Sequence, residues 1–180
     1  MTTVTHESSS ARPADERDAP VVTVDAVGWD DADAAALRAA QEAEMNARYG
    51  GEDDAPPIDP TTIVTTLVAR VDGVPAATVA VRDVSGRDDN RGRGAAHPAA
   101  TGEVKRLYVA PERRGLGLAR RLMAEVERAA RQVGFRRFVL ETGTAQPEAI
   151  GLYESLGYES IEKYGDHVHE EQQRCYGKRL

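Results

Sequence analysis

A short glycine-containing turn surrounded by arginines is the first feature of this sequence that could do chemistry. Residues 114–119 read Arg-Gly-Leu-Gly-Leu-Ala, and Arg113, Arg120 and Arg121 add three further cations around them. Glycine has no Cβ atom, so an anion can approach the backbone closely at such a turn. Arginine forms bidentate hydrogen bonds with phosphate oxygens. The turn is therefore predicted to bind a phosphate or pyrophosphate group.

The residues on either side of the turn indicate how it is positioned. Residues 103–109 are rich in strand-forming side chains, and Pro111 ends this strand because proline cannot donate to a sheet ladder. Apolar residues then recur at helical spacing from Ala119 to Val133. The turn is thus expected at a helix N-terminus, where about four amide groups lack intrahelical partners and the helix dipole attracts anions.

Two other phosphate-binding motifs do not fit these residues. No Lys-Ser or Lys-Thr pair follows the glycines, as a P-loop requires, and Arg120 stands where Gly-x-Gly-x-x-Gly needs its third glycine. The simpler interpretation is a strand-to-helix corner whose arginines are only solvated. The residues of the turn alone leave that interpretation open.

The turn resembles the acetyl-CoA signature of the Gcn5-related N-acetyltransferase (GNAT) family, which reads Arg/Gln-x-x-Gly-x-Gly/Ala. Arg114, Gly117 and Ala119 match this signature in register. The similarity continues in residues 140–143 and 146–158, which read Leu-Glu-Thr-Gly and Gln-Pro-Glu-Ala-Ile-Gly-Leu-Tyr-Glu-Ser-Leu-Gly-Tyr.

This resemblance covers about residues 60–180 and implies an enzyme that uses acetyl-CoA as co-substrate and needs no metal. The implied acceptor is a primary amine of a small or amino-acid-like molecule, which attacks the thioester directly. Alternatives are a peptide or protein amine as acceptor, or an acyl-CoA-binding sensor without turnover. The implied cofactor contacts are the backbone of Leu107, Tyr108 and Val109 for the pantetheine arm, and Arg114, Gly115, Leu116, Gly117, Leu118, Ala119 and Arg120 for the pyrophosphate.

Three side chains are candidates for acid–base chemistry. The resemblance implies that Tyr153 protonates the departing thiolate, and a phenol of pKa ~10 suits that role. A tyrosine packed in the core is the alternative. Glu103 lies where some family members place a catalytic glutamate, although it could instead be paired with Lys105. Glu141, at the end of the next predicted strand, is the second candidate for base or substrate anchor.

The composition limits the class of protein. A length of 180 residues predicts one domain, and a net charge of -7 argues against a general nucleic-acid binder. The single cysteine, Cys175, favours a reducing compartment and is expected to be buried rather than nucleophilic. No apolar run of ~18 residues predicts a membrane span, and the N-terminus lacks a signal-peptide pattern. A cytoplasmic protein with no membrane partner is expected, and a homodimer is compatible with the sequence.

The order of predicted elements indicates a single α/β domain. The resemblance implies a mixed sheet of six to seven strands, flanked by helices, with a splay between the fourth and fifth strands. Residues 1–19 are expected to be a disordered tail, residues 20–180 the acetyltransferase domain, and residues 83–102 a flexible insertion. Strands are predicted near 21–27, at 61–70, 74–82, 103–109, 136–141, 158–164 and 172–178, and helices at 32–49, from about 119 to 133, and from 147 to about 157.

Weaker candidates lie elsewhere in the chain. His167, His169 and Glu170 could ligate a metal, but an exposed loop without a partner cluster disfavours this. The acidic run at 52–54 could attract a cationic amine, although such a run is usually only solvated. Trp29 is expected to pack the first helix against the core rather than to line an acceptor pocket.

Overall fold

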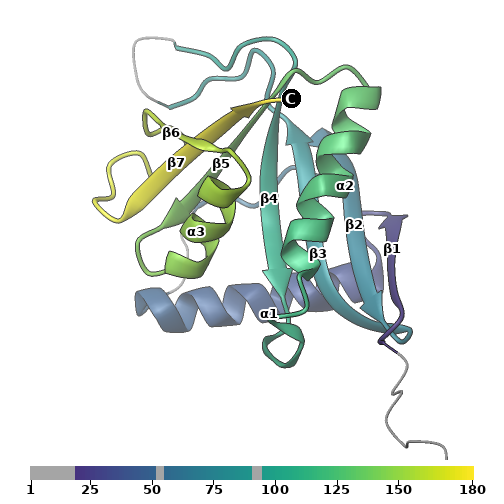
Figure 1. Cartoon of the computed structure of the whole chain (residues 1–180). Helices are drawn as coiled ribbons and strands as arrows, with labels where there is room; N and C mark the ends of the chain where they lie inside the picture. The colour runs from purple at the N-terminus through teal and green to yellow at the C-terminus, as the bar shows by residue number, and fades with distance from the viewer. Residues whose placement is uncertain (1–18, 52–54, 91–94) are drawn as a thin grey trace, which may run out of the picture.

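A mixed β-sheet with strand order β1-β2-β3-β4-β5-β7-β6 forms the middle of the molecule (Figure 1). The computed structural model describes residues 19–51, 55–90 and 95–180. Within these residues the sheet has seven strands, which confirms the predicted α/β domain with six to seven strands. The strands are β1 (Val22–Val27), β2 (Ile63–Val71), β3 (Val74–Asp83), β4 (Thr101–Val109), β5 (Arg137–Gly143), β6 (Glu159–Ile161) and β7 (Gln173–Arg179).

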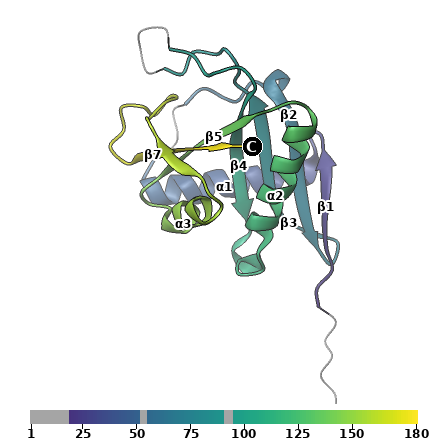
Figure 2. The same cartoon turned by 45° about the horizontal axis from the view of Figure 1, so that its top comes forward.

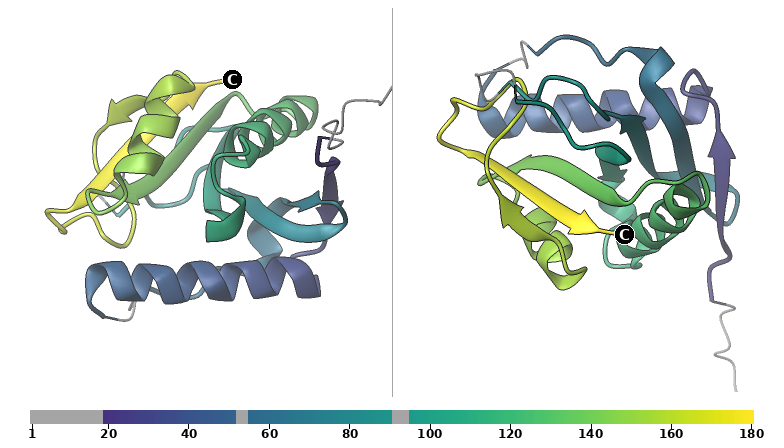
Figure 3. Two further views of the ribbon diagram at one scale, coloured as in Figure 1. Left: turned by 60° about the horizontal axis from the view of Figure 1, so that its bottom comes forward. Right: turned by 90° about the horizontal axis from the view of Figure 1, so that it is seen from above.

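The helices lie on both faces of the sheet. Helix α1 (Ala32–Tyr49) covers one face, while α2 (Leu118–Gln132) and α3 (Pro147–Ser155) cover the other (Figure 3). Helix α2 buries an apolar stripe that includes Leu122 and Met123, neither of which is exposed at all. Helix α1 packs more thinly, through Ala34 and Leu37. The edge strands are β1 on one side and the short β6, next to β7, on the other, and Figure 2 shows β1 and β7 on opposite sides of the sheet.

Local sequence signals account for most of these elements. The Asp31 carboxylate caps α1 by accepting a hydrogen bond of 3.0 Å from the Ala34 amide. Asp72 and Gly73 join β2 to β3 with φ angles of 51° and 80°, as expected for a tight hairpin turn. Strand β6 is shorter than predicted, since residues 162–164 leave the sheet and bury the Tyr164 ring.

The parallel pairing of β4 with β5 stops halfway along both strands. It runs from Thr101 opposite Arg137 to Val104 opposite Leu140, and no pairing follows. Beyond these residues the two strands diverge, as Figure 1 shows. This is the predicted splay between the fourth and fifth strands, and it leaves residues 105–109 without a partner strand on the β5 side.

A bulge in β4 lies beside the splay. Lys105 is opposite Ala80 and Tyr108 is opposite Thr78, so two β4 residues face one residue of β3. Arg106, one of the two, has φ 58°. A bulge shifts the alternation of side chains by one position. Tyr108 therefore packs against α1, on the same side of the sheet as Lys105.

The connection between β3 and β4 is folded wherever it is described. The His97 amide donates to the Arg87 carbonyl at 2.9 Å, and the Gly86 amide donates to the His97 carbonyl at 2.9 Å. The flexibility expected for residues 83–102 stays a prediction, and residues 91–94 lie outside the described part. Residues 1–18 of the expected disordered tail also lie outside it. Among the described residues, no helix combines the length and apolarity needed to cross a membrane.

Gly102 provides a test of how tightly the paired half of β4 is packed. A Cβ atom there would lie 2.8 Å from the Phe138 ring and 3.0 Å from Val81 Cγ1. Gly102→Ala is therefore expected to lower the free energy of unfolding by about 1–3 kcal/mol, because both neighbours are fully buried. Gly151→Ala in α3 is the control. No atom outside the backbone of that helix lies within 4 Å of the Gly151 Cβ position, so this substitution should be neutral or stabilising. Urea unfolding measures both, and equal stabilities of the two variants would contradict the packing argument.

Candidate active site

The glycine turn lies at the N-terminus of α2 as predicted. Gly117 is the N-cap residue with φ 74°, and it supplies no side-chain cap. The first helical hydrogen bond runs from the Arg121 amide to the Gly117 carbonyl at 3.1 Å. The amides of residues 118–120 therefore receive no side-chain acceptor, and an anion can bind them. Gly115 also has a left-handed φ of 82°, so the turn depends on glycine at both positions.

The four arginines around the turn divide into two kinds. Arg113 and Arg121 form no ion pair with any residue in the described part of the chain. Arg120 Nη2 donates to Ser155 Oγ on α3 at 2.7 Å. Arg114 Nη2 lies 2.6 Å from Glu44 Oε2 on α1, and its Nε donates to the Val109 carbonyl at 3.1 Å. An anion at the turn would therefore compete with Glu44 for Arg114.

The unpaired segment of β4 carries two carbonyl groups that already have side-chain donors. Gln41 Nε2 of α1 donates to the Leu107 carbonyl at 2.9 Å, and Arg114 donates to the Val109 carbonyl. Tyr108 is buried against α1. Cofactor binding by the backbone of these three residues stays a prediction. It would use their amide groups, or replace the two side-chain donors.

Helix α1 bridges the two branches of the splay on its own side of the sheet. Glu44 contacts Arg114 beyond β4, and it also lies 2.7 Å from Arg48. Arg48 in turn contacts Glu148 of α3 at 2.5 Å and donates to the Ala145 carbonyl at 3.0 Å. A chain of alternating charges thus crosses from the end of β4 to the start of α3.

Glu103 lies in a buried ion-pair cluster on the α1 side of the sheet. Its carboxylate has no exposed surface and pairs with Arg82 of β3. Lys105 Nζ lies 3.3 Å from its Oε1, and the Tyr164 hydroxyl donates to the same oxygen at 3.1 Å. Burial alone would raise the pKa of Glu103, but Lys105 and Arg82 outweigh it and hold the pKa below its usual value. Glu103 is therefore ionised and already engaged by three donors.

Glu141 lies on the same face of the sheet but has a different environment. Its Oε2 is 3.9 Å from Lys105 Nζ, which is too far for a close ion pair, and its side chain is 11% exposed. Burial raises the pKa of Glu141 above its ordinary value, and the nearby charge of Glu103 adds to this effect. Of the two candidate bases, Glu141 therefore has the environment that makes a carboxylate a stronger proton acceptor.

Tyr153 lies on α3, in the main core cluster. Its side chain is 6% exposed, and its ring lies 5.8 Å from the Tyr158 ring and 6.4 Å from the Tyr176 ring. No described residue forms a hydrogen bond with its hydroxyl group. Burial raises the pKa of Tyr153 well above its ordinary value, so the phenol stays protonated. The core position and the donor role are thus compatible.

The weaker candidates from the sequence lie in separate environments. Cys175 is buried on β7, and burial raises the pKa of its thiol to about 11, which disfavours a thiolate nucleophile. His167 Nδ1 lies 2.6 Å from Glu170 Oε1. Trp29 stacks on the Arg38 guanidinium of α1, 3.9 Å from the ring centroid. The acidic run at 52–54 lies outside the described residues.

Three residues of this region were not identified from the sequence. Arg82 of β3 and Tyr164, which follows β6, both contact Glu103. These segments are far apart in the sequence, so only the tertiary fold brings the three residues together. The contact of Gln41 could have been anticipated from its position in the sequence. It follows Ala34 and Leu37 on the face of α1 that packs against the sheet, where a polar side chain needs a polar partner.

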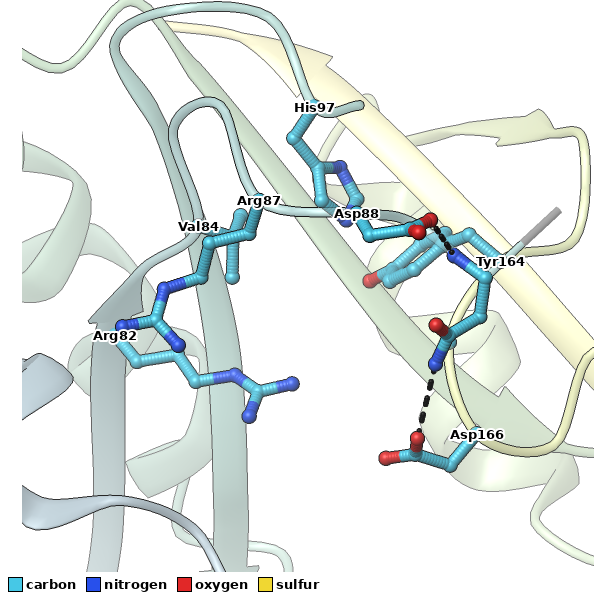
Figure 4. Close-up of a pocket in the computed structure, with 9 residues that line it drawn as sticks. Arg82, Val84, Arg87, Asp88, His97, Tyr164 and Asp166 are labelled. Carbon is cyan, nitrogen blue, oxygen red and sulfur yellow. Dashed lines mark hydrogen bonds between the residues drawn. The ribbon is translucent and has the colours of Figure 1, made fainter. Parts of the chain in front are cut away.

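A pocket of about 390 Å³ lies next to the Glu103 cluster (Figure 4). Its lining comes from the end of β3, from the folded β3–β4 connection, and from the segment that follows β6. Arg82 belongs to both the pocket and the ion-pair cluster. Figure 4 shows the side chains of Arg82 and Arg87 on one side of this pocket and those of Asp88 and Asp166 on the other.

Comparisons with known proteins identify the family of this chain. A sequence profile of the acetyltransferase (GNAT) family matches residues 31–158. The Escherichia coli K12 protein YjgM, an uncharacterized N-acetyltransferase, is 45% identical over 60 residues, which are 33% of this chain. An IAA acetyltransferase of Azospirillum brasilense is 41% identical over 64 residues, which are 36% of this chain. The chain spans 36% and 42% of the lengths of these two curated relatives.

Solved structures share the fold over nearly their whole length. A Klebsiella pneumoniae protein, provisionally named an acyl-CoA N-acyltransferase, superposes with a TM-score of 0.70 at 28% identity, covering 88% of this chain and 97% of that one. The PaiA N-acetyltransferase of Thermoplasma acidophilum, solved in complex with coenzyme A, superposes with a TM-score of 0.62 at 12% identity. It covers 89% of this chain and 99% of that chain, and at this identity it bears on the fold alone.

Proposed function

Because the chain belongs to the acetyltransferase (GNAT) family, we propose that it transfers an acetyl group from acetyl-CoA to a primary amine of a small molecule. One observation carries this proposal: the uncapped N-terminus of α2 lies where the β4–β5 pairing has ended. An anion at the helix would hold one end of a long cofactor, and the unpaired strand would hold the arm that follows. A fully paired sheet would offer only the first of these two sites.

The residues of the turn suit the diphosphate of coenzyme A. Gly115 and Gly117 have no atom within 4 Å of their Cβ positions, so the backbone there is open to a bulky anion. The amides of residues 118–120 and the unpaired Arg113 and Arg121 supply donors and positive charge. When bound, acetyl-CoA would supply an activated thioester carbonyl. The Thermoplasma protein, which shares the fold, was solved in complex with coenzyme A.

The acid–base roles follow from the environments of three side chains. Glu141 is proposed to accept the proton of the acceptor amine, because burial raises its pKa and Lys105 is not closely paired with it. Tyr153 is proposed to donate a proton to the departing sulfur, because its hydroxyl is protonated and free of partners among the described residues. Glu103 is the alternative base, but its three donors favour a role in positioning Lys105.

Coenzyme binding tests the role of the glycine turn. Gly117→Ala is expected to weaken acetyl-CoA binding by at least about tenfold, because a side chain is strained at φ 74° and would cover the helix amides. Gly50→Ala is the matched control, since Gly50 caps α1 at φ 78° and also has open space around it. It should lose similar stability and keep the affinity for acetyl-CoA.

Calorimetry with acetyl-CoA measures this affinity, and thiol release against a panel of amines and short peptides measures turnover. Binding with turnover of small amines is expected. Turnover of peptides alone would move the acceptor to a protein amine, and binding without any turnover would indicate a sensor. No binding by the wild-type protein would refute the assignment of the turn.

Replacing Tyr153 tests the proposed proton donor. Tyr153→Phe is expected to lower kcat by about 10²-fold or more while the affinity for acetyl-CoA is unchanged, because only the donated proton is lost. Tyr176→Phe is the control: its ring belongs to the same aromatic cluster, but its hydroxyl donates to Glu154 at 3.0 Å. A Tyr153→Phe enzyme with the kcat of the control would exclude the role of Tyr153.

The pH dependence of kcat distinguishes the two candidate bases. Activity of the wild-type enzyme should fall as pH falls through the raised pKa of Glu141, since only the ionised carboxylate accepts a proton. Glu141→Gln should abolish this acid limb and lower kcat. Glu103→Gln should keep the limb and instead lower the free energy of unfolding by about 3 kcal/mol, because Arg82 and Lys105 lose a buried partner. The reverse pattern would assign the base to Glu103.

A further inference from the structure

The pocket beside Glu103 contains two guanidinium groups with unused hydrogen-bond donors. Arg82 engages Glu103 through Nε alone, so its two terminal nitrogens have no partner among the described residues. Arg87 forms no side-chain hydrogen bond or ion pair within that same part of the chain. Both residues line the pocket, and Figure 4 shows their guanidinium groups on the same wall. Two like charges that share a pocket wall favour a bound anion.

The carboxylates of the opposite wall do not supply this anion. The Asn90 amide donates to Asp88 Oδ1 at 2.9 Å, and the Asn90 side chain donates to Asp166 Oδ1 at 3.0 Å. Asn90 thus contacts both carboxylates, and Figure 4 shows Asp88 and Asp166 across the pocket from the arginines. The arginine wall is therefore available to an anion that enters from outside.

The pocket lies next to the proposed base. Gly165 lines the pocket, and a Cβ atom at Gly165 would overlap Glu141 Oε1, so the Glu141 carboxylate packs against this part of the pocket wall. A second connection runs from Arg82 through Glu103 to Lys105, whose Nζ lies 3.9 Å from Glu141 Oε2. A small molecule could therefore place one end on the arginines and the other near Glu141. A volume of about 390 Å³ suits a molecule of this size.

We infer that the acceptor is a small amine that carries a carboxylate, which binds Arg82 and Arg87 while the amine faces Glu141. This inference rests on the proposed acetyltransferase function. In the reaction the amine nitrogen forms an amide bond as the carbon–sulfur bond breaks. Glu141 accepts the amine proton and Tyr153 gives a proton to sulfur, so the acceptor carboxylate takes no part in the bond changes. It serves recognition alone.

Matched pairs of acceptors test the inference on the wild-type protein. Glycine, β-alanine and 4-aminobutanoate place the amine at increasing distance from the carboxylate, and the corresponding carboxamides remove only the charge. Thiol release from acetyl-CoA should show kcat/KM at least about tenfold higher for the acid than for the amide at the best length. Equal values for acids and amides, or a preference for the amides, would overturn the inference.

Substitution of Arg87 tests the site itself. Arg87 is exposed, so Arg87→Ala should fold normally. It should raise KM for the acids about ten- to a hundredfold, leave kcat within about twofold, and leave KM for the amides unchanged. Arg87→Lys keeps the charge without the planar fork and should lie between Arg87→Ala and the wild type. Arg128→Ala, which removes an exposed arginine of α2, is the control and should match the wild type.

The possible outcomes distinguish a failure of this inference from a failure of the proposed acetyltransferase function. If the protein binds acetyl-CoA but acetylates no amine, both the proposed function and the acceptor class are wrong. If amines are acetylated and Arg87→Ala changes acids and amides alike, only the assignment of the carboxylate to this pocket is wrong. A rise in KM confined to acids supports both.

Discussion

The end of the β4–β5 pairing after Val104 and Leu140 is the constraint on which the rest of the site depends. Strand edges present unpaired backbone groups that need partners. Side chains of α1 supply some of these partners, as Gln41 does for the Leu107 carbonyl. The bulge at Arg106 further turns the β4 side chains, so that Lys105 and Tyr108 share one face. The interrupted ladder, the bulge and the contact from α1 therefore all lie in the same half of β4.

Two carboxylates on one face of the sheet show how environment separates similar groups. Glu103 is more deeply buried than Glu141, yet its pKa is lowered, because Arg82, Lys105 and Tyr164 all stabilise its charge. Glu141 has Lys105 only at 3.9 Å, and burial dominates its pKa. The ionised Glu103 also disfavours the charge on Glu141, so the buried cluster helps to make its neighbour more basic. In the proposed mechanism Glu103 thus acts on the base Glu141 rather than on the substrate.

The sequence was informative where the signal is local. The glycine turn, the α2 stripe and the Asp72-Gly73 hairpin each depend on a few neighbouring residues, and each was predicted correctly. The pairing of Glu103 with Lys105, two residues away, was among the sequence-based interpretations. The contacts of Glu103 with Arg82 and Tyr164 could not be predicted, because these residues meet it only through sheet register and a chain segment about sixty residues away. The β3–β4 connection has no periodicity, so its hydrogen bonds and its share of the pocket were equally hidden.

The ion pair between Glu44 and Arg114 has a consequence for cofactor energetics. Any phosphate that binds Arg114 replaces an internal counter-ion rather than finding a bare cation. The free energy of that contact is then the difference between two ion pairs, and it is smaller than either. Such an exchange leaves the number of paired charges nearly constant, so this contact adds little to the dependence of affinity on ionic strength. Glu44 would keep Arg48 as its partner, so the exchange would be confined to the C-terminal part of α1.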